Sequence, residues 1–210
     1  LDNFVKVWDS SSGASEAALS GHGAYVVGVA VAPVGEQFAS ASHDKTARLW
    51  NREGQQAVLE GHSDLVIAVA YRPDGKLLAS TSKDGTIRTW NLKGEAEKTL
   101  SGHDGTVESI VFLPDNRHAV VTLETQDRVA IVDTQSLRIL RTYPIGNGAR
   151  EGHMIHLSPE GNRVYVGGRL GGGTVSVVYL DEDRNPTVIQ TGLGAEAITV
   201  TPDGAHVWVI

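Results

Sequence analysis

VVGVAVAPVGEQFASASHDKTARLWN, residues 26–51, recurs as VIAVAYRPDGKLLASTSKDGTIRTWN at residues 66–91, with a constant offset of 40 residues. A Gly-His pair precedes each copy at residues 21–22 and 61–62, and a third pair follows at residues 102–103. In both copies an Asp precedes a Trp by six residues, and the opening residues 2–9 keep the same spacing. Because a fixed period of this length is typical of proteins built from one repeated unit, the repeat decides the fold.

Each copy predicts four short antiparallel strands. Apolar residues alternate with small ones in residues 66–71, which is the two-residue period of a half-buried strand. The Pro-Asp-Gly turn at residues 73–75 leads into a strand at 77–82, and a second turn leads into a strand at 86–90. A weaker fourth strand follows at 96–100. A sheet of this kind buries its faces only by stacking on its neighbours, so the predicted fold class is all-β.

The Gly-His pair, the Asp and the Trp-Asp or Trp-Asn dipeptide at this period resemble the WD-repeat β-propeller family. The Trp-Asp dipeptide itself occurs at residues 8–9, and Asn51 and Asn91 replace the Asp in the next two copies. The third copy keeps its Gly-His pair and Asp127 but has Val132 at the Trp position. The resemblance covers residues 1–133 and implies a β-propeller of four-stranded antiparallel blades.

Residues 150–210 depart from this pattern. They carry a Ser/Thr-Pro-x-Gly motif before an aliphatic strand, once at residues 158–161 and again at residues 201–204. This motif resembles the bacterial propeller repeats named for Tyr-Val-Thr-Asn, with Tyr165 and Val166 as the closest trace. The mixture predicts a prokaryotic source.

The repeats divide the chain into five blades' worth of strands, 20 in all. The expected divisions are a partial blade at residues 1–20, repeats at 21–60, 61–101, 102–144 and 145–191, and a partial blade at 192–210. The first piece supplies the last two strands of a blade, and the final piece supplies the first two. The two ends are therefore expected either to complete one shared blade or to mark a fragment of a larger propeller. The absence of Met at Leu1 favours a cut start, and unclosed ends would permit a homo-oligomer.

The resemblance implies that the recurring polar residues form a hydrogen-bonded tetrad inside each blade. The first set is His22, Ser40 or Ser42, Asp44 and Trp50, and the second is His62, Ser80 or Ser82, Asp84 and Trp90. Buried polar groups need partners, and such a network ties three strands together. The same set occurring twice argues against a catalytic relay, since an active site is rarely duplicated in each blade.

The resemblance also implies that partners bind mainly across one face of the propeller. This face is formed by the loops that lead into each first strand and by the turns between second and third strands. The candidates are Tyr25, Leu65, Thr106 and Glu151 in the loops, and His43, Lys83 and Gln126 in the turns. Tyr25 and Leu65 suit an interface anchor, because they are apolar side chains at positions expected to be exposed. The alternative is that Tyr25 packs on its own blade.

Composition excludes several classes of function. The net charge is −7, with 18 Lys and Arg against 25 Asp and Glu and no basic run, which disfavours nucleic acid and anionic membrane surfaces. The chain has no cysteine, which excludes disulfides, thiolate metal sites and covalently attached c-type haem. No apolar stretch approaches the roughly 18 residues of a membrane span, so membrane insertion is not expected.

Two further motifs do not predict a ligand site. Strand alternation places Glu151 and His153 on one face and His156 on the other, so no convergent metal site is predicted. The glycines at residues 167–168 and 171–173 predict a hairpin between two strands, because no helix follows to make a phosphate-binding loop.

The sequence therefore predicts a non-catalytic scaffold that binds protein or peptide partners and needs no cofactor. The alternatives are a bacterial propeller enzyme of lactonase-like or redox-associated type, and a permanent structural subunit of a larger complex. The WD-type half favours a cytoplasmic location, while the bacterial-type half leaves a periplasmic or exported one open.

Overall fold

The computed structural model describes residues 2–103, 105–146, 150–170, 173–182, 184–192 and 197–209, without the side chains of residues 150, 151, 169 and 170. In these residues the regular structure is β-strand throughout, apart from one 3-10 turn, which confirms the all-β prediction. No helix within the described ranges is long and apolar enough to cross a bilayer. The chain divides into two compact units, residues 1–101 and residues 102–210.

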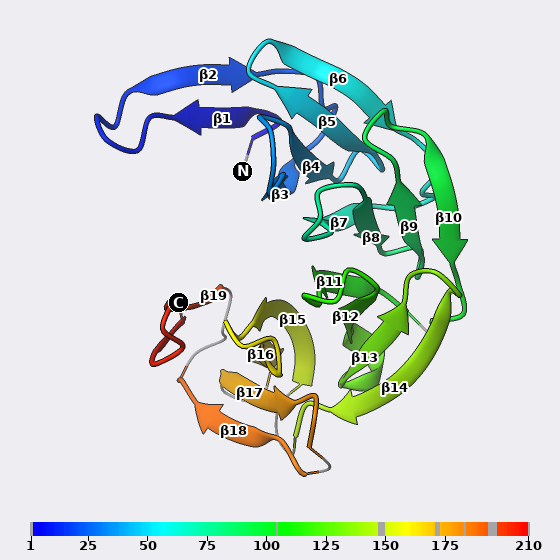
Figure 1. Cartoon of the computed structure of the whole chain (residues 1–210), viewed down its shortest axis with the longest axis vertical. Helices are drawn as coiled ribbons and strands as arrows, with labels where there is room; N and C mark the ends of the chain where they lie inside the picture. Colours follow the sequence, from blue (N-terminus) through cyan, green and yellow to red (C-terminus); the bar gives the residue numbers. More distant parts are fainter. Residues whose placement is uncertain are drawn as a thin grey trace. The chain divides into compact units, whose positions relative to one another are not determined.

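Unit 1 contains a two-stranded sheet followed by two four-stranded antiparallel sheets (Figure 1). The first sheet is β1 (Val5–Trp8) and β2 (Ser15–Leu19). The second is β3 (Val26–Val31), β4 (Phe38–Ser42), β5 (Ala47–Asn51) and β6 (Gly54–Leu59), and the third is β7 (Val66–Tyr71), β8 (Leu78–Ser82), β9 (Ile87–Trp90) and β10 (Ala96–Leu100). In both four-stranded sheets the strands follow chain order, as expected of a propeller blade.

Unit 2 contains two four-stranded antiparallel sheets and ends with a two-stranded one. The first is β11 (Val107–Phe112), β12 (His118–Leu123), β13 (Arg128–Asp133) and β14 (Arg138–Pro144). The second is β15 (Arg150–Leu157), β16 (Arg163–Leu170), β17 (Thr174–Tyr179) and β18 (Thr187–Gln190), and the last is β19 (Ile198–Val200) and β20 (Val207–Val209). The division of the chain into blades stays a prediction. A single propeller over all 210 residues, and one blade shared by its two ends, stay predictions.

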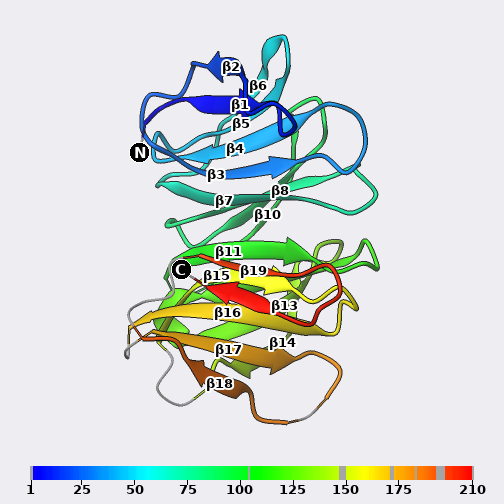
Figure 2. The ribbon, with the colours of Figure 1, turned by 90° about the vertical axis from the view of Figure 1, so that its left-hand side faces the viewer.

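The core of unit 1 lies between its two four-stranded sheets, where β3 and β7 lie side by side (Figure 2). A Cβ on Gly28 would lie 3.0 Å from the carbonyl oxygen of Ile67, so a glycine is what lets these two strands approach so closely. Trp50 and Trp90 are each 1% exposed. Unit 2 has two core clusters. One contains Tyr143 of β14, Ile145 and aliphatic residues of β12, β13, β15, β16 and β17. The other is formed by residues of β16, β17 and β19.

Two local features differ from the sequence expectation. β16 and β17 pair antiparallel on either side of the glycine motif, as the predicted hairpin requires, but Gly167 and Gly168 belong to β16 and not to the connection. Residues 171 and 172 of the motif lie outside the described residues. The turn before β13 forms a 3-10 turn, η1 (Glu124–Gln126), which ends at Asp127 with a φ of 49°. The repeat pattern gave no signal for this turn.

Candidate interaction surface

A chain of hydrogen bonds crosses the sheet β3–β6 beneath its loops. The Nδ1 atom of His22 lies 2.7 Å from a carboxylate oxygen of Asp44, and its Nε2 atom lies 2.7 Å from the Oγ of Ser40. The indole N–H of Trp50 donates to the same Oγ at 2.7 Å. The loop before β3 is thereby linked to β4, to β5 and to the turn between them.

The sheet β7–β10 repeats this geometry. His62 lies 2.9 Å from Asp84 through Nδ1 and 2.8 Å from the Oγ of Ser80 through Nε2. The indole N–H of Trp90 donates to Ser80 at 2.9 Å. The same four residue types therefore meet in the same order in both sheets.

The bonding order assigns the protons of each network. Asp44 can only accept, so Nδ1 of His22 carries the hydrogen and Nε2 accepts from the hydroxyl of Ser40. Ser40 in turn accepts from Trp50. Ser, His and Asp stand in the order of a hydrolytic triad, but Ser40 and the His22 side chain are 0% exposed. No substrate can reach the hydroxyl, so the network holds the sheet together and is not placed to perform nucleophilic chemistry.

The sequence left the choice of serine open in each set, and the geometry separates the two roles. Ser42 donates to the carbonyl oxygen of Ala24 at 3.2 Å and accepts from the backbone N–H of Asp44 at 3.1 Å. Ser82 makes the equivalent bonds in the next sheet, to Asp64 and from Asp84. These second serines fix the loop before the first strand against the turn before the third strand.

Sequence reasoning missed one member of each network. The hydroxyls of Thr46 and Thr86 donate to the second carboxylate oxygen of Asp44 and Asp84, at 2.7 and 2.6 Å. The signal was present, because a Thr follows the Asp by two residues in both copies. The third copy has Arg128 and Val129 after Asp127, which is consistent with a different turn there.

The networks set the pKa values of their ionisable groups. Burial lowers the pKa of His22 and of His62 below the ordinary value of 6.5, although the bond to Asp acts in the opposite direction. Burial also opposes the ionisation of Asp44, but hydrogen bonds from Thr46, the Gly23 amide and His22 outweigh it and lower the pKa to about 2. Asp84 is held at about 2 by equivalent bonds.

The third repeat keeps the histidine without its network. His103 is 9% exposed, and neither of its ring nitrogens has a hydrogen-bond partner among the described residues. Val132 replaces the Trp. Val121 replaces the Ser, because its pairing with Ala130 corresponds to the pairing of Ser80 with Arg88 in the second repeat. Burial alone lowers the pKa of His103.

These shifts predict how stability depends on pH. Because burial lowers the pKa of His22, His62 and His103 in the folded chain, the unfolded chain binds more protons once the pH falls below 6.5. We expect full stability above that pH and a progressive loss as the pH falls through 6.5 toward the lowered values. The contribution of Asp44 and Asp84 is lost separately, as the pH falls from 3.8 toward about 2.

Urea denaturation at a series of pH values from about 7.5 to about 5.5 tests the loss of stability that we attribute to the three buried histidines. The matched control is His206→Gln, which removes an exposed histidine that belongs to neither network. A midpoint that stays constant over this range in the parent chain would show that the buried histidines do not control stability.

Above the first network, the exposed Tyr25 lies beside the half-buried His43. The backbone N–H of His43 donates to the carbonyl oxygen of Tyr25 at 3.0 Å, and the two ring centroids are 6.1 Å apart. Tyr25 is nevertheless 50% exposed, so much of the residue faces solvent.

The next sheet places Leu65 and Lys83 in the same relation. The backbone N–H of Lys83 donates to the carbonyl oxygen of Leu65 at 3.0 Å; Leu65 is half-buried and Lys83 is exposed. A further contact joins the two sheets, because the ammonium group of Lys45 donates to the carbonyl oxygen of Ser63 at 3.0 Å. Lys45 was not among the sequence candidates, although it follows the Asp of the first network directly.

The remaining candidates lie in unit 2. Thr106 is half-buried, and its carbonyl oxygen accepts from the backbone N–H of Glu124 at 3.3 Å. Gln126 is exposed at the end of the 3-10 turn. The side chain of Glu151 lies outside the described residues.

A buried acid–histidine pair in unit 2 was not foreseen. The carboxylate of Glu108, 5% exposed, lies 3.1 Å from Nδ1 of His153. His156 instead places its Nδ1 atom 2.9 Å from the carbonyl oxygen of Leu157. Among the described residues, no group of three or more His, Asp or Glu side chains is arranged to hold a metal ion.

Comparison with known proteins finds short segments of similarity to three curated relatives. The first is the chromatin assembly factor 1 subunit FAS2 homolog of Oryza sativa subsp. japonica, which is 42% identical over 55 residues. The second is lissencephaly-1 homolog 1 of Paramecium tetraurelia, which is 40% identical over 55 residues. The third is protein tipD of Dictyostelium discoideum, which is 42% identical over 52 residues. The segments are 26%, 26% and 25% of this chain, but only 11%, 14% and 8% of the relatives.

A family model gives the wider match. The description "WD domain, G-beta repeat" (WD40) fits residues 13–51, 54–91 and 94–131, which together are more than half of the chain. The first two matches end at Asn51 and Asn91, directly after the Trp of each network. With four-stranded antiparallel sheets in chain order and the repeated hydrogen-bond networks, this match shows that the chain belongs to the WD40 repeat family.

Proposed function

We propose that this chain is a non-catalytic scaffold that binds partner proteins or peptides through the loop surface of unit 1. This loop surface consists of Tyr25, His43, Leu65 and Lys83. The observation that carries the proposal is Tyr25, a 50% exposed aromatic ring whose backbone is fixed by His43. A large ring held at a rigid position gives binding area at little cost in conformational entropy, which is why Tyr is common among interface anchors.

The networks beneath the surface support this proposal. Ser42 and Ser82 tie each loop to its neighbouring turn, and Lys45 ties the turn of one sheet to the loop of the next. Such fixed loops keep the loop surface pre-organised, which lowers the cost of ordering it when a partner binds. Thr106 and Gln126 hold the equivalent places in unit 2, and we propose that they contact partners in the same way.

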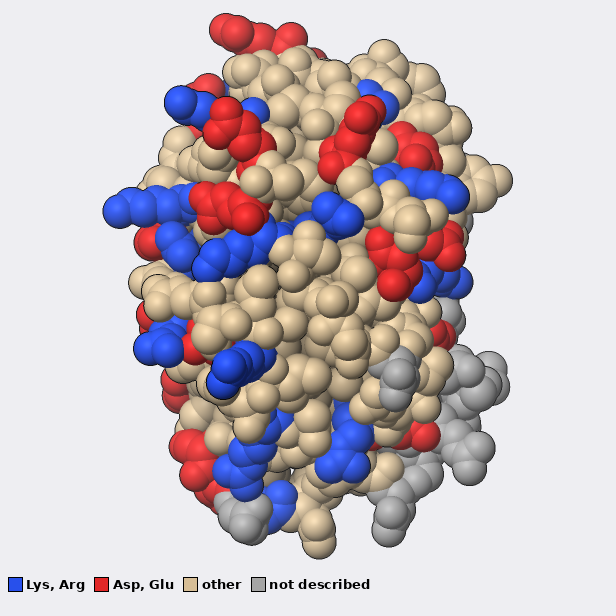
Figure 3. All heavy atoms as spheres, turned by 90° about the vertical axis from the view of Figure 1, so that its right-hand side faces the viewer, with Lys and Arg blue, Asp and Glu red and all other residues tan. Residues whose placement is uncertain are grey.

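A hydrolytic enzyme is less well supported, because the Ser-His-Asp order of both networks is closed to solvent. The charge distribution does not favour nucleic acid as the partner. On the face of unit 1 that Figure 3 shows, the Lys and Arg side chains are interspersed with Asp and Glu, so its described residues form no continuous basic area there of the kind that neutralises phosphates. One of the relatives is by name a subunit of chromatin assembly factor 1, which is consistent with a role in a protein assembly, including a permanent one.

The test is affinity capture from the lysate of the source organism. The variant carries Tyr25→Ala, Leu65→Ala and Lys83→Ala together, and we expect it to lose a specific partner that the parent chain retains. Three changes at anchors of this kind are expected to weaken binding by roughly a hundredfold or more.

The matched control carries Val34→Ala, Leu92→Ala and Lys93→Ala, which are exposed residues of similar type in the turns at the opposite end of the sheets. It is expected to capture the same partner as the parent chain. Equal capture by both triple variants would remove the loop surface as the binding site, and loss in the control alone would move the site to the opposite end.

A further inference from the structure

Strand β14 is the outer strand of a sheet whose four strands are all present, in the middle of the sequence. In the order β11-β12-β13-β14 it pairs with β13 alone among the described residues, and β6, β10 and β18 are the outer strands of the other four-stranded sheets. β14 is the longest of these outer strands, with 7 residues against 6, 5 and 4. Such an edge presents backbone N–H and C=O groups that can pair with another strand.

The exposed side chains of β14 differ from those of the other outer strands. Ile139 is 42% exposed and Leu140 is 53% exposed, and the flanking Arg138 and Arg141 are exposed as well. The fully described β6 and β10 carry no exposed large hydrophobic residue, and β18 carries one. β14 contains no acidic residue, whereas β10 carries one residue of each charge. Two neighbouring exposed aliphatic residues between two cations are therefore particular to β14 among these outer strands.

The neighbouring strand does not neutralise the arginines of β14. Asp133 lies opposite Arg138 in the register of β13 and β14, but its carboxylate is bound by Arg117 at 2.7 and 3.0 Å and by two backbone N–H groups of the following turn. Arg138 makes no ion pair with any described residue. Arg141 lies 4.8 Å over the ring of Tyr143, which orients the guanidinium group without removing its charge. Figure 3 shows this side of unit 2 in its lower half, where the blue side chains lie toward the middle and the red ones toward the edges.

The backbone of β14 has groups that point away from β13. The N–H of Ile145 donates to the carbonyl oxygen of Asp127 at 3.1 Å, so Ile145 directs its backbone groups toward β13. Successive residues of a strand direct these groups to alternate sides, and Thr142 therefore directs its N–H and C=O to the outer side. Pro144 faces the same way and has no N–H, so pairing with a further strand ends before it. The edge that another strand can use is residues 138–143.

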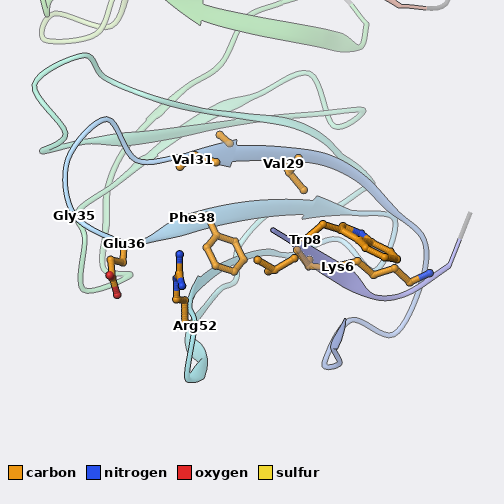
Figure 4. Close-up of a pocket in the computed structure, with 11 residues that line it drawn as sticks. Lys6, Trp8, Val29, Val31, Gly35, Glu36, Phe38 and Arg52 are labelled. Atoms are coloured by element: carbon orange, nitrogen blue, oxygen red, sulfur yellow. The ribbon is translucent and has the colours of Figure 1, made fainter. Parts of the chain in front are cut away.

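A second apolar area lies in unit 1 and lacks this charge. It is a groove of about 400 Å³ lined mainly by apolar side chains of β1, β3 and β4 (Figure 4). The cations among its lining residues are already paired, Lys6 with Asp2 at 2.6 Å and Arg52 with Glu16 at 3.8 Å. The groove therefore offers no free cation of the kind that β14 presents.

We propose that β14 binds an extended acidic segment of a partner protein, which adds to the sheet as a fifth strand. The backbone of the segment pairs with the outward N–H and C=O of Thr142. Its carboxylates bind Arg138 and Arg141, and its apolar residues cover Ile139 and Leu140. Strand addition of this kind takes its affinity from backbone hydrogen bonds and its specificity from the side chains. The site lies in unit 2 and adds a second interaction surface to the loop surface of unit 1.

The charges of β14 argue against two other occupants. A second copy of β14 would bring its own arginines against these, and like charges on paired strands are destabilising. A nucleic acid has no strand backbone that could pair with the free edge. The net charge of −7 also repels a long polyanion more strongly than a short acidic segment.

The first test is the binding of a fluorescein-labelled peptide of about eight residues, a usual strand length, in which Glu and Val alternate. Fluorescence anisotropy with the full chain should show binding of this peptide and no binding of the matched peptide of alternating Lys and Val. Arg138→Glu with Arg141→Glu should weaken binding by about thirtyfold or more. Lys93→Glu with Lys98→Glu is the matched control, since it makes the same change in net charge at exposed residues of the sheet β7–β10 and should bind as the parent does.

Two variants of Thr142 test strand addition separately from charge. Thr142→Pro removes the outward N–H at a position where an edge strand tolerates proline, whereas Thr142→Val keeps the N–H. Both lose the bond that the hydroxyl accepts from Arg128 at 3.2 Å, so that loss cannot explain a difference between them. We expect Thr142→Pro to weaken binding by about tenfold or more and Thr142→Val to bind as the parent does. In the parent chain, bound peptide should slow hydrogen exchange of the Thr142 amide by about tenfold or more.

A parent chain that binds neither peptide would overturn the proposal, as would equal binding of the acidic peptide by the parent and by the arginine variant. Equal binding by Thr142→Pro and Thr142→Val would exclude strand addition. Tighter binding of a single-stranded oligonucleotide of similar length would show that the ligand is a nucleic acid instead.

Two controls complete the test. Far-ultraviolet circular dichroism confirms that each variant is folded, which is expected because the changed side chains of β14 lie at the surface. The variant with Tyr25→Ala, Leu65→Ala and Lys83→Ala should bind the acidic peptide as the parent does. Failure of the loop surface of unit 1 and failure of the β14 site are therefore distinguishable.

Discussion

Replacing Trp50 by alanine is expected to lower the free energy of unfolding of unit 1 by about 3–5 kcal/mol, the usual cost of removing a fully buried aromatic side chain. Trp50 is 1% exposed, and its ring centroid lies 5.9 Å from that of His22. Its indole N–H also donates to Ser40. The variant therefore loses core packing and leaves the Ser40 hydroxyl without one of its two partners.

Trp8→Ala is the matched comparison, because Trp8 stands at the same repeat position but is 58% exposed. We expect a loss of less than about 1 kcal/mol for this change, as for a surface substitution. Urea denaturation followed by tryptophan fluorescence reports mainly on unit 1, which holds three of the four Trp residues. Equal losses in the two variants would show that burial of Trp50 does not stabilise the unit.

The repeated networks illustrate what a sequence pattern can predict. His22, Asp44 and Trp50 could be assigned to one network because their spacing recurs unchanged 40 residues later. The serine could not be chosen, because Ser40 and Ser42 are two residues apart on one strand and share a face. The choice depends on which hydroxyl lies within reach of the indole, and that follows from the pairing of β4 with β5.

The features that were missed depend on contacts without a repeat signal. Glu108 and His153 are 45 residues apart and come from different sheets, so no local period connects them. Among the described residues the 3-10 turn after β12 occurs once, in the third copy, which lacks the Thr that follows the Asp by two residues in the first two copies. Tyr25 could be placed in a loop by its position before β3, but its contact with His43 required the pairing of that loop with a turn 18 residues later.

Two histidines at the same repeat position are expected to respond to leucine with opposite signs. His22→Leu should destabilise the chain by about 2–4 kcal/mol, because Asp44 loses a partner for its partly buried charge and Ser40 loses its acceptor. His103→Leu should stabilise it by about 1–2 kcal/mol, because an apolar group replaces a buried ring whose nitrogens have no hydrogen-bond partner among the described residues.

Hydrogen exchange measures both changes in the appropriate unit, since it reports the local opening free energy of the strands next to each histidine. His103→Leu should also remove the part of the pH dependence of unit 2 that arises as the pH falls through 6.5, because burial lowers the pKa of His103 and the leucine does not titrate. A destabilisation by His103→Leu as large as that by His22→Leu would show that His103 has acquired a partner of its own. The opposite signs would show that the network, and not the histidine itself, is what stabilises a blade.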